Sequence, residues 1–199
     1  TSLTLNNAIF KGNSASEGGA IYNAGTLVVS DSIFEENIAT ISGSAMTNVG
    51  TATFINSSFY KNVTNVGGAI TNDGTLNIIA NNGISEFIGN YRTSYNDSAT
   101  ISQDTADGVT NLNAGNSGFI NIVGRIYAEG TLNINKTGIK LADGVTDAPT
   151  DGEILISGVG FVPLEAGKYG DINVFDGTLS FAKEIFLNNS KISLNLYGG

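Results

Sequence analysis

The residues whose types could support binding are Tyr91, Arg92 and Tyr95. They form an aromatic and cationic group within 91–115, a stretch that otherwise consists mainly of Ser, Thr, Asp and Asn. Such a group can stack on a sugar ring or a peptide, or it can pack its own loop against the wall of the fold. We therefore take these three residues as candidate binding residues, with packing as the alternative.

Catalytic chemistry has few candidates in this chain. With no Cys and no His, the sequence excludes a Cys or His nucleophile, an imidazole general base and a metal site built from soft ligands. Acid–base work would fall to carboxylates, Lys, Arg or Tyr. The nine Lys and Arg residues are scattered. The closest acidic pair, Glu35 and Glu36, is expected to point to opposite faces of a strand. We assign no catalytic residue.

An acidic run, 143–153, is the one segment that suggests a metal. Several carboxylates in a flexible loop could gather Ca²⁺, which takes six to eight oxygen ligands. The spacing does not match an EF-hand loop, and a Gly-Gly-x-Gly-x-Asp repeat is missing. We therefore assign no metal and no cofactor, and leave open whether this loop binds calcium.

The elements that must position these residues come from a repeat. Gly25, Gly50 and Gly74 each precede Thr, which gives a period of 24 or 25 residues. Such a unit cannot bury its apolar face alone and must stack on its neighbours, so the sequence predicts a solenoid.

Apolar residues alternate with small or polar ones after each of these positions, which indicates short strands with one buried face. The alternating pairs are Leu3/Leu5, Leu27/Val29, Ala52/Phe54, Leu76/Ile78, Leu132/Ile134 and Leu179/Phe181. A second row is Phe10, Phe34, Phe59, Ile139 and Phe186, and a third is Ile21, Met46, Ile70 and Ile126. We predict an all-β, right-handed, single-stranded parallel β-helix with three short strands per turn and about eight turns.

Asparagine recurs at one corner of the predicted turn. The residues are Asn13, Asn37, Asn62, Asn90 and Asn189. Asn tolerates left-handed backbone and can bond neighbouring backbone groups, and stacked copies can form an amide ladder. The corner is therefore predicted to hold such a ladder.

The domain organisation follows from where the repeat is broken. Residues 1–199 are expected to form one β-helix domain, and the abrupt pattern at both ends favours a fragment of a longer chain. Two stretches, 91–115 and 143–163, are expected to be irregular loops or insertions. Such loops either carry binding or are passive.

Two motifs resemble the repeats of polymorphic outer-membrane proteins. They are Gly-Gly-Ala-Ile, at 18–21 and 67–70, and Phe-x-x-Asn, which begins at Phe10, Phe34, Phe59, Phe87 and Phe186. Residues 44–46 depart from the first motif as Ser-Ala-Met. The resemblance implies a β-helical autotransporter passenger carried to the bacterial surface, commonly adhesive, and it supplies no catalytic residues.

The functional expectation is a non-catalytic, surface-exposed or secreted bacterial module that acts as an adhesin or a stalk. Its partner would be a host-cell surface protein or glycan, or neighbouring copies end to end. The net charge of −9 makes nucleic acid a poor partner, and no segment is apolar enough to insert into a membrane. A self-assembling filament subunit and a polysaccharide-active enzyme are the alternatives. The enzyme would require Asp or Glu beside Lys or Arg across adjacent turns.

Overall fold

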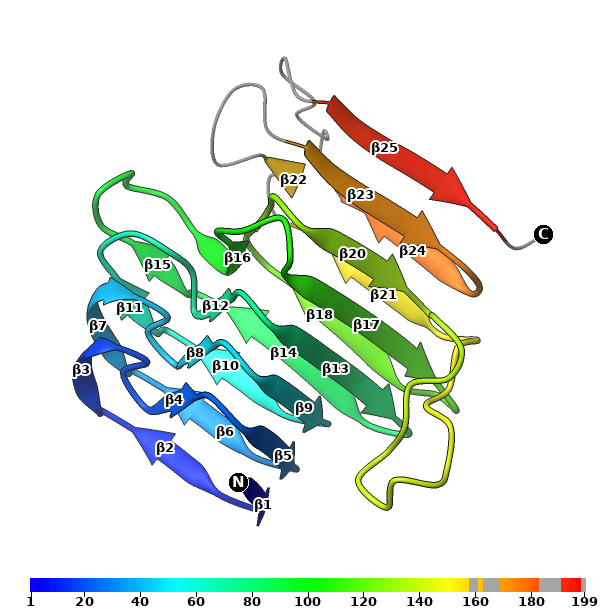
Figure 1. Ribbon diagram of the computed structural model, residues 1–199, viewed down its shortest axis with the longest axis horizontal. Helices are drawn as coiled ribbons and strands as arrows, with labels where there is room; N and C mark the ends of the chain where they lie inside the picture. Colours follow the sequence, from blue (N-terminus) through cyan, green and yellow to red (C-terminus); the bar gives the residue numbers. More distant parts are fainter. Residues whose placement is uncertain (158–160, 163–168, 183–190, 198–199) are drawn as a thin grey trace.

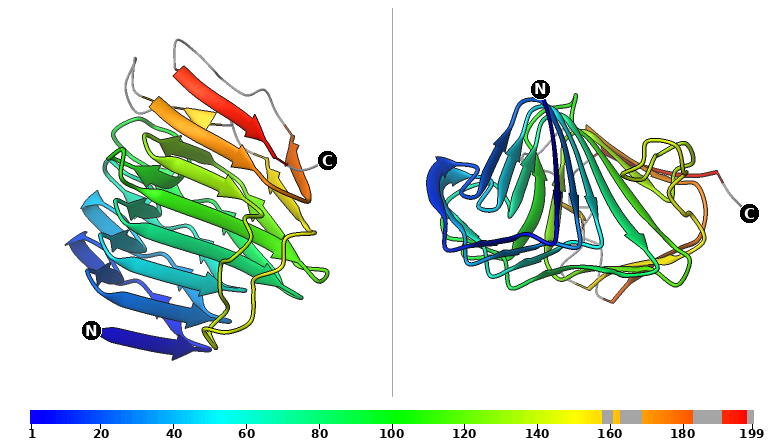
Figure 2. Two further views of the ribbon diagram at one scale, coloured as in Figure 1. Left: turned by 45° about the vertical axis from the view of Figure 1, so that its right-hand side comes forward. Right: turned by 90° about the horizontal axis from the view of Figure 1, so that it is seen from below.

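The computed structural model describes residues 1–157, 161–162, 169–182 and 191–197. In these residues every regular element is a β-strand, and every strand ladder is parallel. Figure 1 shows the strands stacked one above another from the N-terminus to the C-terminus, and Figure 2 shows the chain winding around one interior. The prediction of an all-β parallel β-helix is confirmed.

The strands form four sheets, which we call A to D. Sheet A contains Ser2–Asn6 (β1), Thr26–Ser30 (β5), Thr51–Ile55 (β9), Thr75–Asn81 (β13), Val109–Gly115 (β17), Thr131–Ile134 (β20), Tyr169–Val174 (β23) and Lys191–Leu196 (β25). Sheet B contains Ile9–Lys11 (β2), Ile33–Glu35 (β6), Ser58–Tyr60 (β10), Ile84–Ile88 (β14), Phe119–Ile122 (β18), Glu153–Ile156 (β21) and Thr178–Phe181 (β24). Sheet C contains Ser14–Glu17 (β3), Ile38–Ser42 (β7), Val63–Thr64 (β11) and Tyr91–Arg92 (β15). Sheet D contains Ile21–Asn23 (β4), Met46–Asn48 (β8), Ile70–Asn72 (β12), Ala99–Gln103 (β16), Arg125–Ala128 (β19) and Phe161–Val162 (β22).

Sheets A, B and D supply the three strands of a turn. With eight strands in sheet A and seven in sheet B, the described chain makes between seven and eight turns. Sheet C adds a fourth short strand to the first four turns only. In the next turn the chain passes directly from β18 in sheet B to β19 in sheet D, so the solenoid has a step in its wall above β15.

The core consists of columns of like side chains. The rings of Phe10, Phe34, Phe59 and Phe87 stack along the axis, with successive centroids 4.7, 4.9 and 4.6 Å apart. The predicted third row is also confirmed, since Ile21, Met46, Ile70 and Ile126 lie on one column of sheet D. Ile101, from the stretch expected to be irregular, joins that column between Ile70 and Ile126.

The predicted asparagine ladder forms, but its backbone differs from the expectation. The Oδ1 atoms of Asn37, Asn62 and Asn90 each accept from the backbone N and the Nδ2 of the asparagine one turn before, at 2.9–3.0 Å. Left-handed backbone occurs one residue earlier, at Gly12, Glu36, Lys61 and Gly89. The asparagines are therefore fixed by side-chain bonding, while their neighbours take the left-handed corner conformation, which is strained at Glu36 and Lys61 but not at the glycines. Asn189 lies outside the described residues.

Two further amide ladders were not predicted. At the end of sheet D, the Nδ2 of Asn23 donates to Asn48, and that of Asn48 donates to Asn72, both at 2.7 Å. Along the outer face of sheet A, successive donors lie 2.8–3.0 Å from their acceptors. This second ladder consists of Asn77, Asn111, Asn133, Asn173 and Asn195.

Two parts of the predicted register are wrong. Leu179 and Phe181 lie in sheet B, opposite Ile154 and Ile156, and not in sheet A. Ile139 is not in a strand and packs on the outside of sheet A. The cause is the long connection 135–152, which shifts the phase of the later turns. Alternation alone cannot tell which sheet a strand joins. Phe186 lies outside the described residues.

Both expected irregular stretches contain regular strands. Residues 91–115 contain β15, β16 and β17, which pair in register with neighbouring turns, so the irregular parts are 93–98 and 104–108. The second stretch, 143–163, contains β21 and β22. The true insertion is 135–152, which we call the strap. It runs back along the solenoid, where Ile139, Leu141 and Ala148 cover Ile55 and Ile79 (Figure 1).

Candidate functional site

The predicted binding residues lie at the step where sheet C ends. β15 is the last strand of that sheet, so its upper edge would be unpaired. Residues 93–98 fold back over it as a hairpin, with the N–H of Arg92 donating to Asp97 O at 2.8 Å and the N–H of Asp97 donating to Arg92 O at 3.3 Å. We call residues 91–98, Arg125 and Tyr127 the ledge.

Arg92 occupies an unusual position for a cation. It lies on the column of Ala15, Ala39 and Thr64, and the residue is 2% exposed. Its Nε and Nη2 donate to the two oxygens of Asp97, each at 3.0 Å, which is the bidentate geometry that favours arginine. A long side chain fits here because no fifth strand of sheet C follows β15.

Arg92 also lies between two aromatic rings. Its Cζ is 3.9 Å from the ring centroid of Tyr95 and 4.1 Å from that of Tyr127. Tyr95 is 61% exposed, whereas Tyr127 is buried, so the guanidinium lies against an outer ring and an inner one. Arg92 therefore does not reach solvent but holds the exposed Tyr95 in place.

The structure brings all three predicted site residues together. Tyr91 is half-buried, and its hydroxyl donates to Oδ1 of Asn96 within the hairpin. The ledge is further anchored to the turn below, where the N–H groups of Thr93 and Ser94 donate to the carbonyls of residues 64 and 65 at 2.9 and 3.0 Å. The packing interpretation thus holds for Arg92, and Tyr95 is the member available to a ligand.

Asp97, Arg125 and Tyr127 were missed by the sequence interpretation. Nη1 of Arg125 donates to Oδ2 of Asp97 at 2.8 Å, and the Tyr127 hydroxyl donates to the same oxygen at 2.6 Å. Desolvation raises the pKa of Asp97, but bonds from Arg92 and Tyr127 and the charges of both arginines outweigh it and lower that pKa overall. Of these three residues, Tyr127 could have been found from the sequence, because an alignment of 124–132 with 19–27 places it on the outer row that begins with Tyr22.

A column of three acids lies beside the ledge, at the corner between sheets D and A. Asp73, Asp104 and Glu129 follow β12, β16 and β19, which are neighbouring strands of sheet D. The N–H of Asp104 donates to Oδ1 of Asp73 at 3.2 Å. Desolvation of the carboxyl group and the charges of Asp73 and Glu129 raise the pKa of Asp104 to about 6, although the residue is partly exposed to solvent.

The acidic strap does not gather its carboxylates. Asp143 caps its own turn by accepting from the N–H groups of residues 145 and 146 at 2.9 Å. Asp147 pairs with Lys140 at 2.7 Å, and Asp151 accepts from the N–H of Asn116 at 3.2 Å. Within the described residues no group of three carboxylates has a geometry suited to a metal ion.

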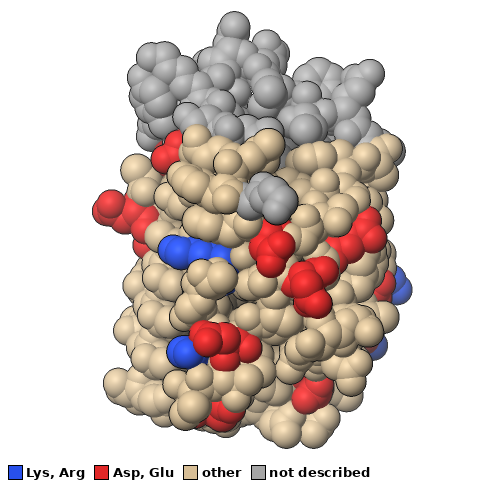
Figure 3. All heavy atoms as spheres, turned by 90° about the vertical axis from the view of Figure 1, so that its right-hand side faces the viewer, with Lys and Arg blue, Asp and Glu red and all other residues tan. Residues whose placement is uncertain are grey.

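The acidic pair Glu35 and Glu36 also differs from the expectation. Both carboxylates reach Lys11, at 2.9 and 3.5 Å, because Glu36 takes the left-handed corner conformation and no longer alternates with Glu35. All three side chains are at least partly exposed, so this is a solvated ion pair. Acidic side chains outnumber basic ones on the face shown in Figure 3, in keeping with the net charge of −9.

Comparisons with protein-family models, with curated proteins and with solved structures each gave no match. The described part of the chain contains no helix with the length and hydropathy needed to cross a membrane.

Proposed function

We propose that this chain is a non-catalytic binding module of the bacterial cell surface or the secreted fraction, in which a β-helical stalk presents the ledge as an adhesive site. The observation that carries the proposal is the exposed ring of Tyr95, held against the buried guanidinium of Arg92. The surface location rests on the motif resemblance to autotransporter passengers.

The physical reason is preorganisation. A tyrosine offers a large apolar face and a polar hydroxyl, and it loses little conformational freedom when it binds. Here the ring already lies on Arg92, whose own position is fixed by two bonds to Asp97. The entropic cost of ordering the site when a ligand stacks on Tyr95 is therefore small.

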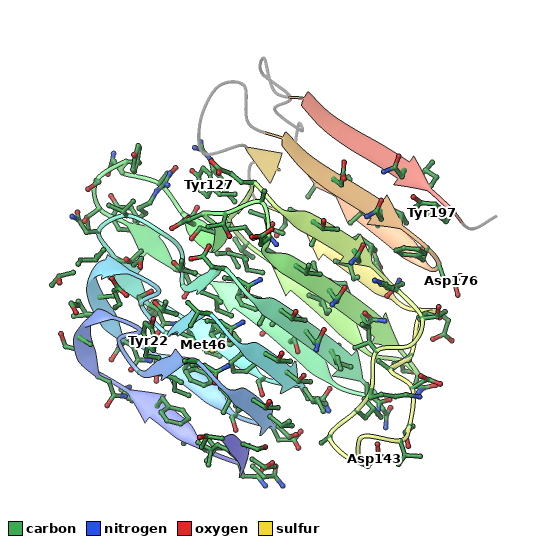
Figure 4. All side chains as sticks on the ribbon, viewed as in Figure 1. Tyr22, Met46, Tyr127, Asp143, Asp176 and Tyr197 are labelled. Atoms are coloured by element: carbon green, nitrogen blue, oxygen red, sulfur yellow. The ribbon has the colours of Figure 1, made fainter. Side chains whose placement is uncertain are left out.

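Tyr95→Ala tests this proposal in a screen of glycans and host cells with the whole chain. Tyr22→Ala is the matched control, because Tyr22 is 55% exposed and lies three turns away from the ledge hairpin, near the N-terminal end in Figure 4. We expect binding to be lost in the first variant and kept in the second. Equal binding by both variants would remove the ledge as the adhesive site. Deleting 91–115 is unsuitable, since it would remove β16 and β17.

A second candidate, a carboxylate-based polysaccharide-active enzyme, is favoured by the acidic column. Asp104 has a pKa of about 6, suited to a general acid, and two further carboxylates lie on the adjacent turns. Incubation with polysaccharides, followed by a reducing-end assay, tests this candidate. Cleavage that Asp104→Asn abolishes would favour the enzyme over the adhesin, whereas we expect no cleavage.

A further inference from the structure

The ledge contains an excess of positive charge. Two guanidinium groups, from Arg92 and Arg125, share one carboxylate, that of Asp97. This excess is confined to the ledge, since the acidic column of Asp73, Asp104 and Glu129 lies beside it and the net charge of the chain is −9. Because Asp97 carries one negative charge and the two arginines carry two positive charges, it cannot neutralise the pair fully.

Several guanidinium nitrogens of this pair have no protein partner among the described residues. Nη1 of Arg92 is buried and makes no hydrogen bond. Among the described residues, Arg125 bonds only through Nη1, which donates to Asp97 and to the Tyr127 hydroxyl. The side chain of Arg125 is 32% exposed, so part of it is accessible to a ligand from solvent.

Tyr95 and Arg125 are linked through Arg92 and Asp97. Nη2 of Arg92 and Nη1 of Arg125 contact the same Asp97 oxygen, at 3.0 and 2.8 Å. The ring of Tyr95 lies 3.9 Å from the Cζ of Arg92. An exposed aromatic ring and a partly exposed guanidinium are thus joined through one set of contacts.

We propose that the ledge binds a carboxylated sugar, with the sugar ring on Tyr95 and its carboxylate on Arg125. This inference rests on the proposed function and names the ligand class of the same site. An Arg fork matches a carboxylate in bidentate geometry, and a charge-assisted bond is about twice as strong as a neutral one. Arg92 is a positioning residue in this account, because it is buried under Tyr95.

The test compares acidic oligosaccharides with their methyl esters, which keep the rings and lose the charge. The probes are uronate oligomers and sialylated oligosaccharides, each in both forms, titrated against the whole chain. We expect the acid forms to bind about 10- to 100-fold more tightly than the esters, and added salt to weaken only the acid forms.

Three variants test whether Arg125 causes the preference for the acid forms. Arg125→Gln should lower acid binding to the level of the ester, and Arg125→Lys should restore part of the preference. Lys11→Gln removes an exposed cation in the first turn, three turns below the ledge hairpin, and should change nothing. Circular dichroism confirms that each variant is folded. If Arg125→Gln does not fold, the carboxylate assignment is decided by the ratio of acid to ester affinity, measured for the unmodified chain and for Arg125→Lys.

The outcomes separate this inference from the proposed function. Equal binding of acid and ester, or a preference that survives Arg125→Gln, would overturn the carboxylate assignment and leave Tyr95-dependent binding standing. No binding of any acidic probe would also overturn it. The proposed function fails separately, if the wider screen of neutral glycans and host cells shows no binding that depends on Tyr95.

Discussion

Replacing Asn62 by alanine should lower the free energy of unfolding by about 3–5 kcal/mol. The residue is fully buried in the middle of the corner ladder. Its Nδ2 donates to Phe34 O and to Asn90 Oδ1, at 2.9 and 3.0 Å. Its Oδ1 accepts from the N–H and the Nδ2 of Asn37, at 3.0 and 2.9 Å. The substitution therefore removes four hydrogen bonds from one turn.

The magnitude follows from what each partner retains. Four bonds at a net contribution of about 1 kcal/mol each give about 4 kcal/mol. Asn37 Nδ2 keeps its bond to Phe10 O, and Asn90 Oδ1 keeps the backbone N–H of residue 62. The N–H of Asn37 loses its acceptor. Since Asn62 is not among the residues with positive φ, alanine neither relieves nor adds backbone strain.

Urea denaturation followed by circular dichroism measures this loss as a shift in midpoint at constant m-value. Asn13→Ala is the matched control, because Asn13 is the exposed end of the ladder and its side chain donates one bond, to Asn37 Oδ1 at 2.9 Å. We expect this control to cost less than about 1.5 kcal/mol. If both variants lose the same stability, the ladder contributes nothing beyond its exposed end, and the reasoning is wrong.

Further predictions concern the core, the acidic column and the ledge. Phe34→Ala should cost about 3–5 kcal/mol in the same assay, because the ring is fully buried between two neighbouring rings, and a loss below about 1 kcal/mol would contradict its inward register. The pKa of Asp104 is raised to about 6, so the folded state holds this proton more tightly than the unfolded state. Protonation of Asp104 therefore stabilises the fold at low pH, and this contribution is lost as the pH rises through about 6. Asp104→Asn should flatten that pH dependence in urea titrations at several pH values, and an unchanged slope would exclude this carboxyl as its source. Arg92→Leu should lower the free energy of unfolding by about 3–5 kcal/mol, because it leaves the Asp97 carboxylate in a largely buried site without its bidentate partner. The double variant Arg92→Leu, Asp97→Leu removes that carboxylate as well and should lose less stability than the single variant.

The sequence predicted the fold and the corner ladder because both repeat at nearly constant spacing. Asn37 and Asn62 are 25 residues apart, and their Phe-x-x-Asn motifs are intact. The ladder on sheet A escaped notice because its spacing varies: Asn77 and Asn111 are 34 residues apart, whereas Asn111 and Asn133 are 22 apart. Residues stack by turn, and a turn can lengthen at its corners without disturbing the strands, so a fixed period misses a ladder whose turns differ in length. The sheet D ladder keeps spacings of 25 and 24 residues, so the repeat already contained the signal for it.

The ledge exists because sheet C ends there, and that links the site to the fold. Arg92 takes a place that Ala15, Ala39 and Thr64 fill in earlier turns, which a large cation can do only if nothing stacks above it. A strand edge left open at that level must be covered, and the hairpin that covers it carries Tyr95 outward. A large charged residue in an inward column of small ones is therefore the sequence signal for both the end of sheet C and the position of the candidate site. Had Arg92 been aligned with Ala39 before the structure was known, the packing role of the arginine and the exposure of the tyrosine would both have followed.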